Sequence, residues 1–415
     1  MDAASTNTIQ SFKMLQTVAA KVFDQCDKEF VNRVRTKGPN IASRYICQFT
    51  IELLSRQPGG FQGVINRVAS ILNEGTQLQY APSSVCEARK KFPAELFKDL
   101  NTKFLEAHSS QHSSARWLGR RLFAVDGSKI ILPKQLEKEG FRPEKKESHY
   151  PTGKLSVLYE VKTQLIHDMS LNSHWDERLA AEDHFKYLST KDVVIYDRGY
   201  FSYHMLGLHR SLGIDFIIRI SVDIGVKAFA DFKERNTNKK HVSEIINLPL
   251  KSMKKITKAE MASTDQSQTQ RVRILKYTFA DVEYFLITSL LDEVQFPSED
   301  FPDVYHSRWG VEEIYKLIKQ TILHKSFNST CFRTVCHEIF AASLMANIGR
   351  MISTNIEAIP KVKTKKKDKN QGTEKEEKNQ TQEVASEQIL RLFSISGMYN
   401  NDPPRRARKS NRSSH

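Results

Sequence analysis

Cysteine is scarce in this sequence, and the few that occur form no recognisable framework. There are five in 415 residues, an odd number, and no two are spaced as a CxxC pair. We therefore expect reduced, mostly buried thiols in a cytosolic-type compartment rather than a disulfide scaffold. Cys331, Cys336 and His337 lie close together, but no second ligand pair follows at zinc-like spacing, so we interpret them as helix core.

Long apolar runs are also missing. No stretch reaches the length needed to cross a bilayer, and the N-terminus has no signal-peptide apolar segment. The sequence therefore predicts a soluble cytoplasmic protein with no membrane partner. Because 39% of the residues are hydrophobic, the chain can still build real cores, and its length predicts two or three domains.

Acidic residues are outnumbered by basic ones. Lys and Arg total 63 against 48 Asp and Glu, which gives a formal net charge of +15. Such a balance favours a polyanionic partner, with nucleic acid first and an anionic membrane surface second. The alternative is a basic protein whose charge serves only solubility.

The first hundred residues carry a helical pattern, with apolar residues recurring at spacings of three and four. Two short helices joined by a turn, the second bearing Arg89, Lys90 and Lys91, resemble a helix-turn-helix that would place these cations on DNA. An ordinary helical bundle with a basic face is the alternative.

From Leu122 the pattern changes to strands. LFAVDGSKIIL at 122–132, Leu155–Val161 and Leu165–Leu171 predict three strands, and a helix then precedes the strand Val193–Tyr196. A further helix and the strand Phe216–Ile220 complete an order that is typical of a ribonuclease-H-like mixed α/β sheet. A hairpin near Ala280 predicts a β-rich insertion before the last helices.

These patterns give six predicted segments. They are a helical DNA-binding domain at 1–115, the first part of the ribonuclease-H-like core at 116–221, a β-rich insertion at 222–302, the catalytic core helices at 303–358, a disordered charged linker at 359–384, and a short helix with a basic tail at 385–415.

One stretch, YHSRWGVEEIYKLIK at 305–319, combines a phenol, two cations and a carboxylate at regular spacing. On a helix with about 100° per residue, Tyr305, Arg308, Glu312 and Lys319 fall within roughly 60° of one another. Burying such a stripe in a core would be costly, so it suits a surface that holds a divalent metal and binds phosphates. Glu313 is rotated about 100° away and is not equivalent to Glu312.

Three carboxylates complete a candidate site. Asp126 interrupts an apolar strand, Asp197 stands at the end of a later strand, and Glu312 lies on the helix. Each has an ordinary alternative: a turn cap at Asp126, an ion pair with Arg198 at Asp197, and a pair with Lys316 at Glu312. Together, however, such hard oxygen ligands are what a magnesium site needs.

The motifs that carry these residues resemble the DDE transposases of the bacterial insertion-sequence-four family. The resemblance rests on VDGS at 125–128, on YDRGYFS at 196–202, and on the Y-x2-R-x3-E-x6-K signature that Tyr305, Arg308, Glu312 and Lys319 match at every position. It covers about 122–352. The helical region before it is similar only in being helical and basic.

The resemblance implies specific roles. Asp126, Asp197 and Glu312 would be the catalytic, metal-binding triad, holding two Mg²⁺ ions, with Mn²⁺ as a substitute. The other three signature residues would contact DNA phosphates, with Arg198 and Tyr200 as secondary contacts. The protein would cleave double-stranded DNA at transposon ends and join the 3′-hydroxyl ends to target DNA, acting as a homodimer at the bacterial nucleoid.

The sequence departs from the family in one respect. Some members hold a flipped base on a tryptophan of the insertion, but the three tryptophans here, Trp117, Trp175 and Trp309, all lie outside 221–302. Tyr277, Tyr284 or Phe285 are the replacements to consider. Two other functions stay open: a non-catalytic DNA-binding derivative such as a repressor or inhibitor, and a ribonuclease-H-like nuclease without strand transfer.

Overall fold

A computed structural model describes most of the chain. It covers residues 3–31, 41–72, 80–111, 116–174, 176–221, 225–249, 269–323 and 326–357. The predicted linker at 359–384 and the basic tail at 385–415 lie outside these residues. Among the described helices, none is both long and apolar enough to cross a membrane.

The centre of the fold is one mixed sheet of eight strands in the order β3-β2-β1-β4-β5-β8-β7-β6. The pairs β1–β4 and β4–β5 are parallel, and the other neighbours are antiparallel. The order β3-β2-β1-β4-β5 confirms the predicted ribonuclease-H-like α/β sheet. The strands are β1 Leu122–Ile131, β2 Thr152–Glu160, β3 Leu165–Asn172, β4 Val193–Tyr196, β5 Asp215–Arg219, β6 Val242–Pro249, β7 Thr269–Phe279 and β8 Val282–Thr288.

The sheet runs on into the segment where sequence analysis expects an insertion. Strand β8 pairs with β5 through Ile217, Ile218 and Arg219, and β7 and β6 follow outward. A helix, α8 Lys227–Arg235, precedes β6. Neither α8 nor β6 was predicted individually, because this stretch is polar and its apolar residues are sparse.

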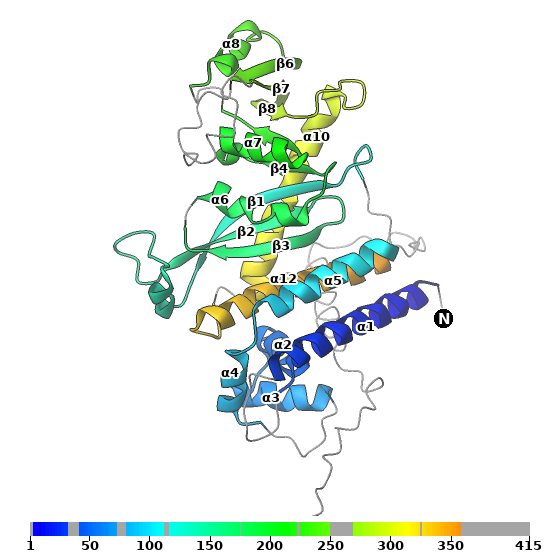
Figure 1. Cartoon of the computed structure of the whole chain (residues 1–415), viewed down its shortest axis with the longest axis vertical. Coiled ribbons are helices and arrows are strands. Elements are labelled where there is room, and N and C mark those ends of the chain that lie inside the picture. Colours follow the sequence, from blue (N-terminus) through cyan, green and yellow to red (C-terminus); the bar gives the residue numbers. More distant parts are fainter. Residues whose placement is uncertain are drawn as a thin grey trace, which may run out of the picture.

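Alternating side chains send the sheet's two faces into two separate cores. Leu122 and Ala124 of β1 belong to one apolar cluster, whereas Phe123 and Val125 belong to the other. The first cluster also contains residues of the N-terminal helices and α12. The second is covered by α6 Glu177–Glu182, α7 Tyr203–Leu212 and α8 (Figure 1).

Of the five N-terminal helices, α1, α2 and α5 pack against the long helix α12 Phe332–Glu357, and α3 and α4 pack against α2; α5 and α12 run side by side (Figure 1). Buried amides tie this layer to the sheet: the Asn347 side chain donates to Asn101 Oδ1 and to the Ile166 carbonyl, both at 2.7 Å. The helices are α1 Ala3–Val31, α2 Ser43–Leu54, α3 Gly60–Ile71, α4 Pro82–Arg89 and α5 Glu95–Gln111.

Arg89 does not occupy the position that sequence analysis predicted for it. Its side chain is only 3% exposed, and its Nη2 lies 3.1 Å from Glu338 Oε1, which is itself buried in α12. It also donates to Ser329 Oγ and to the Thr334 carbonyl. In this conformation Arg89 is an interior ion pair rather than a DNA contact. The neighbouring Lys90 and Lys91 are exposed, and their contact with DNA stays a prediction.

Two of the three residues predicted to be helix core, Cys336 and His337, are core residues of α12, whereas Cys331 precedes this helix and is only partly buried. Cys336 and His337 are buried, and His337 Nε2 donates to the Phe92 carbonyl at 3.1 Å. Burial lowers the pKa of His337 to about 3, so the ring is neutral at physiological pH.

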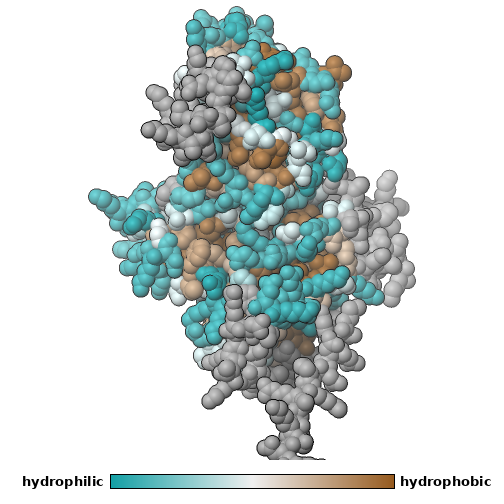
Figure 2. All heavy atoms as spheres, in the orientation of Figure 1, coloured by the Kyte–Doolittle hydropathy of each residue, from teal (hydrophilic) through white to brown (hydrophobic). Residues whose placement is uncertain are grey.

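The visible surface is mostly hydrophilic, and its exposed apolar side chains form small separate patches (Figure 2). Isolated apolar residues on a surface are normal and need no partner. Among the described residues visible in this view, no large continuous apolar surface is seen.

We predict that Arg89→Met destabilises the protein by about 3–5 kcal/mol, because the Glu338 carboxylate would stay buried without a counter-charge. Urea unfolding followed by circular dichroism measures the effect. Lys90→Met, at the adjacent exposed position, is the matched control and should change the unfolding free energy by less than about 0.5 kcal/mol. A fully stable Arg89→Met protein that had lost DNA binding would reinstate the DNA contact.

Candidate active site

Two aspartates lie just beyond the paired stretch of two neighbouring parallel strands, Asp126 within β1 and Asp197 directly after β4. Ala124 of β1 pairs with Ile195 of β4, and Asp126 and Asp197 each follow two residues later. With a side-chain period of two, both carboxylates leave the sheet on the face of Ala124 and Ile195, which belong to the same core cluster. This is the face that the Tyr305–Lys319 segment covers.

The Tyr305–Lys319 segment is helical throughout, but it is not the single regular helix that the sequence predicts. It consists of α10 Phe301–His306, a 3₁₀ turn η5 Ser307–Trp309, α11 Gly310–Lys316 and a π-helical turn η6 Leu317–Ile322. The assumption of 100° per residue therefore fails at two places. A tightened turn carries Arg308, and a widened turn carries Lys319.

Arg308 links two of the three predicted metal ligands. Its Nη1 lies 3.6 Å from Asp126 Oδ2, and its Nη2 lies 3.5 Å from Glu312 Oε1. Burial disfavours the guanidinium cation, but Tyr305, Asp126 and Asp197 together hold the pKa of Arg308 above its ordinary value. Its Nε is buried and has no hydrogen-bond partner among the described residues. The side chain therefore keeps unused donor capacity in the site.

The third carboxylate, Asp197, is held by a phenol and approached by a second arginine. Tyr305 Oη donates to Asp197 Oδ1 at 3.2 Å, and Arg219 Nη1 lies 4.0 Å from the same oxygen. Arg219 closes β5, the parallel neighbour of β4, and its guanidinium lies over the Tyr284 ring at 4.4 Å. Sequence analysis missed Arg219, although a cation at the end of the adjacent parallel strand was a usable signal.

Lys319 reaches the strand that carries Asp126. Its Nζ donates to Ser128 Oγ at 2.7 Å and to the Lys129 carbonyl at 3.2 Å. Both acceptors are neutral, and burial lowers the pKa of Lys319. No carboxylate lies within ion-pair distance of its ammonium group in the described part of the chain, so its charge is left for an external anion.

The two adjacent glutamates separate as predicted. Glu312 pairs with Arg308, whereas Glu313 is 72% exposed and pairs with Lys316 at 2.6 Å. The alternative pair between Glu312 and Lys316 is therefore not formed. On the same helix, Tyr315 Oη donates to the Asp126 carbonyl at 2.6 Å and so connects α11 to β1.

The secondary DNA contacts predicted next to Asp197 divide into one exposed and one buried residue. Arg198 is exposed, and its role as a phosphate contact stays a prediction. Tyr200 is 1% exposed, so in this conformation its ring faces the protein interior and not solvent. Of the aromatic residues considered as base-stacking candidates, Tyr277 and Phe285 are buried and Tyr284 is partly buried beneath Arg219. Trp175 lies outside the described residues.

Burial has a direct electrostatic consequence for Asp126. It raises the pKa of that carboxyl to about 6 even though Arg308 opposes the shift, and the charges of Glu177 and Asp197 raise it further. Because burial disfavours the ionised form of Asp126, a cation that binds beside it would stabilise that form and lower its pKa.

The residues suit a divalent metal in kind but not yet in spacing. Three hard carboxylates are the ligands that Mg²⁺ prefers. Among the described side chains, however, no group of three or more His, Cys, Asp or Glu is arranged so that it could hold a metal ion. Arg308 contacts both Asp126 and Glu312 and serves as a counter-charge between them.

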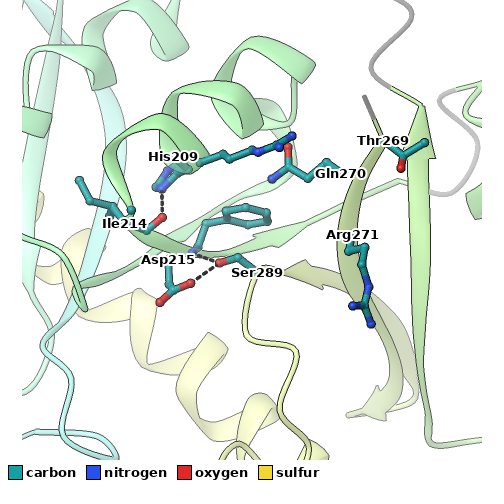
Figure 3. Close-up of a pocket in the computed structure, with 10 residues that line it drawn as sticks. His209, Ile214, Asp215, Thr269, Gln270, Arg271 and Ser289 are labelled. Atoms are coloured by element: carbon teal, nitrogen blue, oxygen red, sulfur yellow. Dashed lines mark hydrogen bonds between the residues drawn. The ribbon is translucent and has the colours of Figure 1, made fainter. Parts of the chain in front are cut away.

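A cavity of ≈ 440 Å³ lies elsewhere, at the beginning of β5 and β7 (Figure 3). Asp215 opens β5, whereas Arg219 and the active site lie at its other end, so this cavity is not the catalytic centre. Its histidine is already used: His209 Nδ1 donates to the Ile214 carbonyl and Nε2 accepts from Tyr196. Burial lowers the pKa of His209 to about 4.

Asp126 in β1, Asp197 directly after β4, Glu312 on the covering helix and the phenol and cations among them together form the candidate site. Residues 117–348, more than half of the chain, match the Transposase DDE domain family, and the chain belongs to that family.

Two known proteins are similar to it. The first is the transposase InsG of insertion sequence element IS4 from Escherichia coli K12, which is 22% identical over 332 residues, or 76% of this chain and 71% of that protein. The second is the piggyBac transposase, solved by cryo-electron microscopy as a synaptic complex with hairpin DNA. It has a TM-score of 0.46 and 10% identity, with coverage of 94% of this chain and 82% of that one. The family match and the InsG similarity confirm the predicted DDE transposase of the IS4 type.

We predict that Asp126→Asn stabilises the metal-free protein in a pH-dependent way. The folded-state pKa of about 6 lies above the unfolded value of about 3.9. The native state therefore binds more protons than the unfolded state between these values, and wild-type stability falls as pH rises through this window. The advantage of the variant should be small at pH 4 and grow to on the order of 2 kcal/mol by pH 7.

Urea unfolding in EDTA at several pH values between 4 and 8 measures this difference. Asp24→Asn, at an exposed position in α1, is the control and should show no such trend. A constant stability difference across the pH range would contradict the raised pKa.

Proposed function

We propose that this transposase cleaves DNA at the ends of its element and joins the freed 3′-hydroxyl ends to target DNA by metal-dependent phosphoryl transfer. The observation that carries the proposal is the state of Arg308. A buried guanidinium with an orphaned Nε, and with ion pairs longer than ordinary hydrogen bonds, has donors left for a phosphate.

The protein groups divide into two sets. Asp126, Asp197 and Glu312 would hold Mg²⁺, with Mn²⁺ as a substitute and two ions as the expected number. The bound metal would supply Lewis-acid stabilisation of charge at the scissile phosphate. Arg308, moving from its two carboxylates onto a phosphate, would release Asp126 and Glu312 for that task.

The remaining signature residues would place the DNA backbone. The Lys319 ammonium group has no carboxylate partner in the described structure and contacts Ser128 and Lys129 on the strand of Asp126, which suits a phosphate beside the scissile bond. Tyr305, held on Asp197, would orient a second oxygen, and the exposed Arg198 would add a contact outside the centre. These contacts position the duplex without reading its sequence.

The biological substrate follows from the same proposal. The InsG relative is named for an insertion sequence element, and we infer that this chain likewise acts on the two ends of one element. Holding two ends together requires at least two protomers, so we expect a homodimer on DNA. Its chromosomal substrate would place the enzyme in the bacterial cytoplasm, at the nucleoid.

We predict that Asp126→Ala and Glu312→Ala each abolish nicking of a duplex carrying the element's end, in Mg²⁺, while DNA affinity stays within about threefold of wild type, because the phosphate contacts remain. The end sequence is taken from inverted repeats flanking the gene. Glu313→Ala is the matched control, since Glu313 is exposed and paired with Lys316, and it should cleave like wild type.

Denaturing gels of the products separate the candidate functions. Cleavage followed by joining supports a transposase reaction, and cleavage without joining indicates a nuclease. A wild-type protein that binds the end but never cuts it would instead be a DNA-binding derivative. Retained cleavage by either alanine variant would remove the triad assignment.

A further inference from the structure

A fourth carboxylate, Glu177, lies behind the two catalytic aspartates. It is the first residue of α6, which covers the face of the sheet opposite to the one from which Asp126 and Asp197 project. Sequence analysis predicted only that a helix precedes the strand Val193–Tyr196, and it assigned no role to Glu177. The structure brings it next to Gly127 of β1, directly after Asp126, and to Gly199 in the turn that follows Asp197.

The contacts of Glu177 are made with two glycines, one in each catalytic motif. A Cβ added to Gly127, directly after Asp126, would lie 3.2 Å from both Cγ and Oε1 of Glu177. A Cβ on Gly199, two residues after Asp197, would lie 3.6 Å from Glu177 Oε2. The side chain therefore lies close to both backbone segments, and a Cβ at Gly127 would force the Lys154 and Glu177 side chains to shift.

A buried lysine fixes the carboxylate in this position. Lys154 of β2 forms an ion pair with Glu177 through Nζ and Oε1, and its side chain is only 9% exposed. Its stem crosses Gly127 as well, because a Cβ there would lie 2.8 Å from Lys154 Cε. The Lys154–Glu177 ion pair thus lies directly against the backbone at Gly127.

The helix that carries Glu177 is anchored firmly at its other end. His184, just beyond α6, is fully buried; its Nδ1 donates to Asp168 Oδ2 and its Nε2 shares a hydrogen bond with Ser156 Oγ, both at 2.9 Å. Lys98 of α5 completes this network with an ion pair to Asp168 at 2.8 Å. Burial disfavours the Asp168 carboxylate, but His184 and Lys98 more than compensate and hold its pKa at about 2.

One further polar atom points to the same place. The Tyr200 hydroxyl is buried and has no hydrogen-bond partner among the described residues. Burial, and after it the negative charge of Glu177, raise the pKa of Tyr200 well above its ordinary value. The Tyr200 hydroxyl is therefore a further buried polar group near Glu177 that is unpaired among the described residues.

We propose that Glu177 is a positioning residue of the catalytic centre. Together with Lys154 it sets the spacing between the backbone segments that carry Asp126 and Asp197. The inference rests on the proposed function, because spacing matters only if the two carboxylates share a metal. Supporting groups that orient metal ligands typically change metal affinity or activity by about 10–100-fold when they are removed.

The test compares Mn²⁺ binding by the full-length chain, measured by electron paramagnetic resonance, with nicking of the end duplex. Glu177→Gln keeps the size of the side chain but removes its charge, and Glu177→Ala removes both. We expect about tenfold weaker Mn²⁺ binding for Gln and a larger loss for Ala. Nicking should fall in parallel, with DNA affinity unchanged.

Two controls separate positioning from mere stability. Glu182→Gln alters the same helix at a glutamate that pairs with His204, and it should leave Mn²⁺ affinity and nicking unchanged. The double variant Glu177→Ala/Lys154→Met removes both buried charges, so its unfolding midpoint should return toward wild type while its Mn²⁺ affinity stays low.

Three outcomes overturn the inference. Mn²⁺ affinity and nicking within twofold of wild type in Glu177→Ala would show that the side chain positions nothing. Recovery of Mn²⁺ affinity in the double variant would show that only fold stability was at stake. A wild-type chain that neither binds Mn²⁺ nor nicks would defeat the proposed function itself, and with it this inference. Wild-type activity together with unaffected Glu177 variants defeats the inference alone.

Discussion

The contact between the Arg308 guanidinium and Asp126 links the Tyr305–Lys319 segment to the central sheet in this structure. Asp126 comes from a strand and Glu312 from a helix almost two hundred positions later in the chain, and Arg308 contacts both. Glu312 is 53% exposed, whereas Asp126 is largely buried, so Arg308 chiefly offsets the charge of Asp126.

The N-terminal helices are joined to the sheet through polar contacts as well as apolar packing. Arg89 with Glu338, Asn347 with Asn101, and Lys98 with Asp168 each cross from the helical layer to α12 or to β3. Buried polar contacts demand specific partners, whereas apolar packing tolerates small shifts. The helical layer and the sheet consequently share one defined arrangement.

Much of this arrangement could be predicted from local signals in the sequence. Apolar, β-branched runs identify β1, β4 and β5, because central strands are buried on both faces. The three acids and the Tyr305–Lys319 stripe follow from motif spacing. The edge strand β6 was not identified individually, because it lies within a longer stretch that is predominantly polar and basic. Arg89 was misassigned because a cation on a short helix looks exposed until its partner, 249 positions away, is known. Glu177 was overlooked because its significance depends on two glycines in other segments.

The π-helical turn at Leu317–Ile322 changes how the spacing in the family signature should be understood. Seven positions separate Glu312 from Lys319, which on a regular helix would stack them two turns apart on one side. A widened turn advances less per residue, so the same count brings the ammonium group to Ser128, across on the first strand. In this structure, the seven-residue spacing between Glu312 and Lys319 therefore includes a π-helical turn. Removing or adding a single residue between these two positions would change the direction of the lysine far more than its distance along the chain.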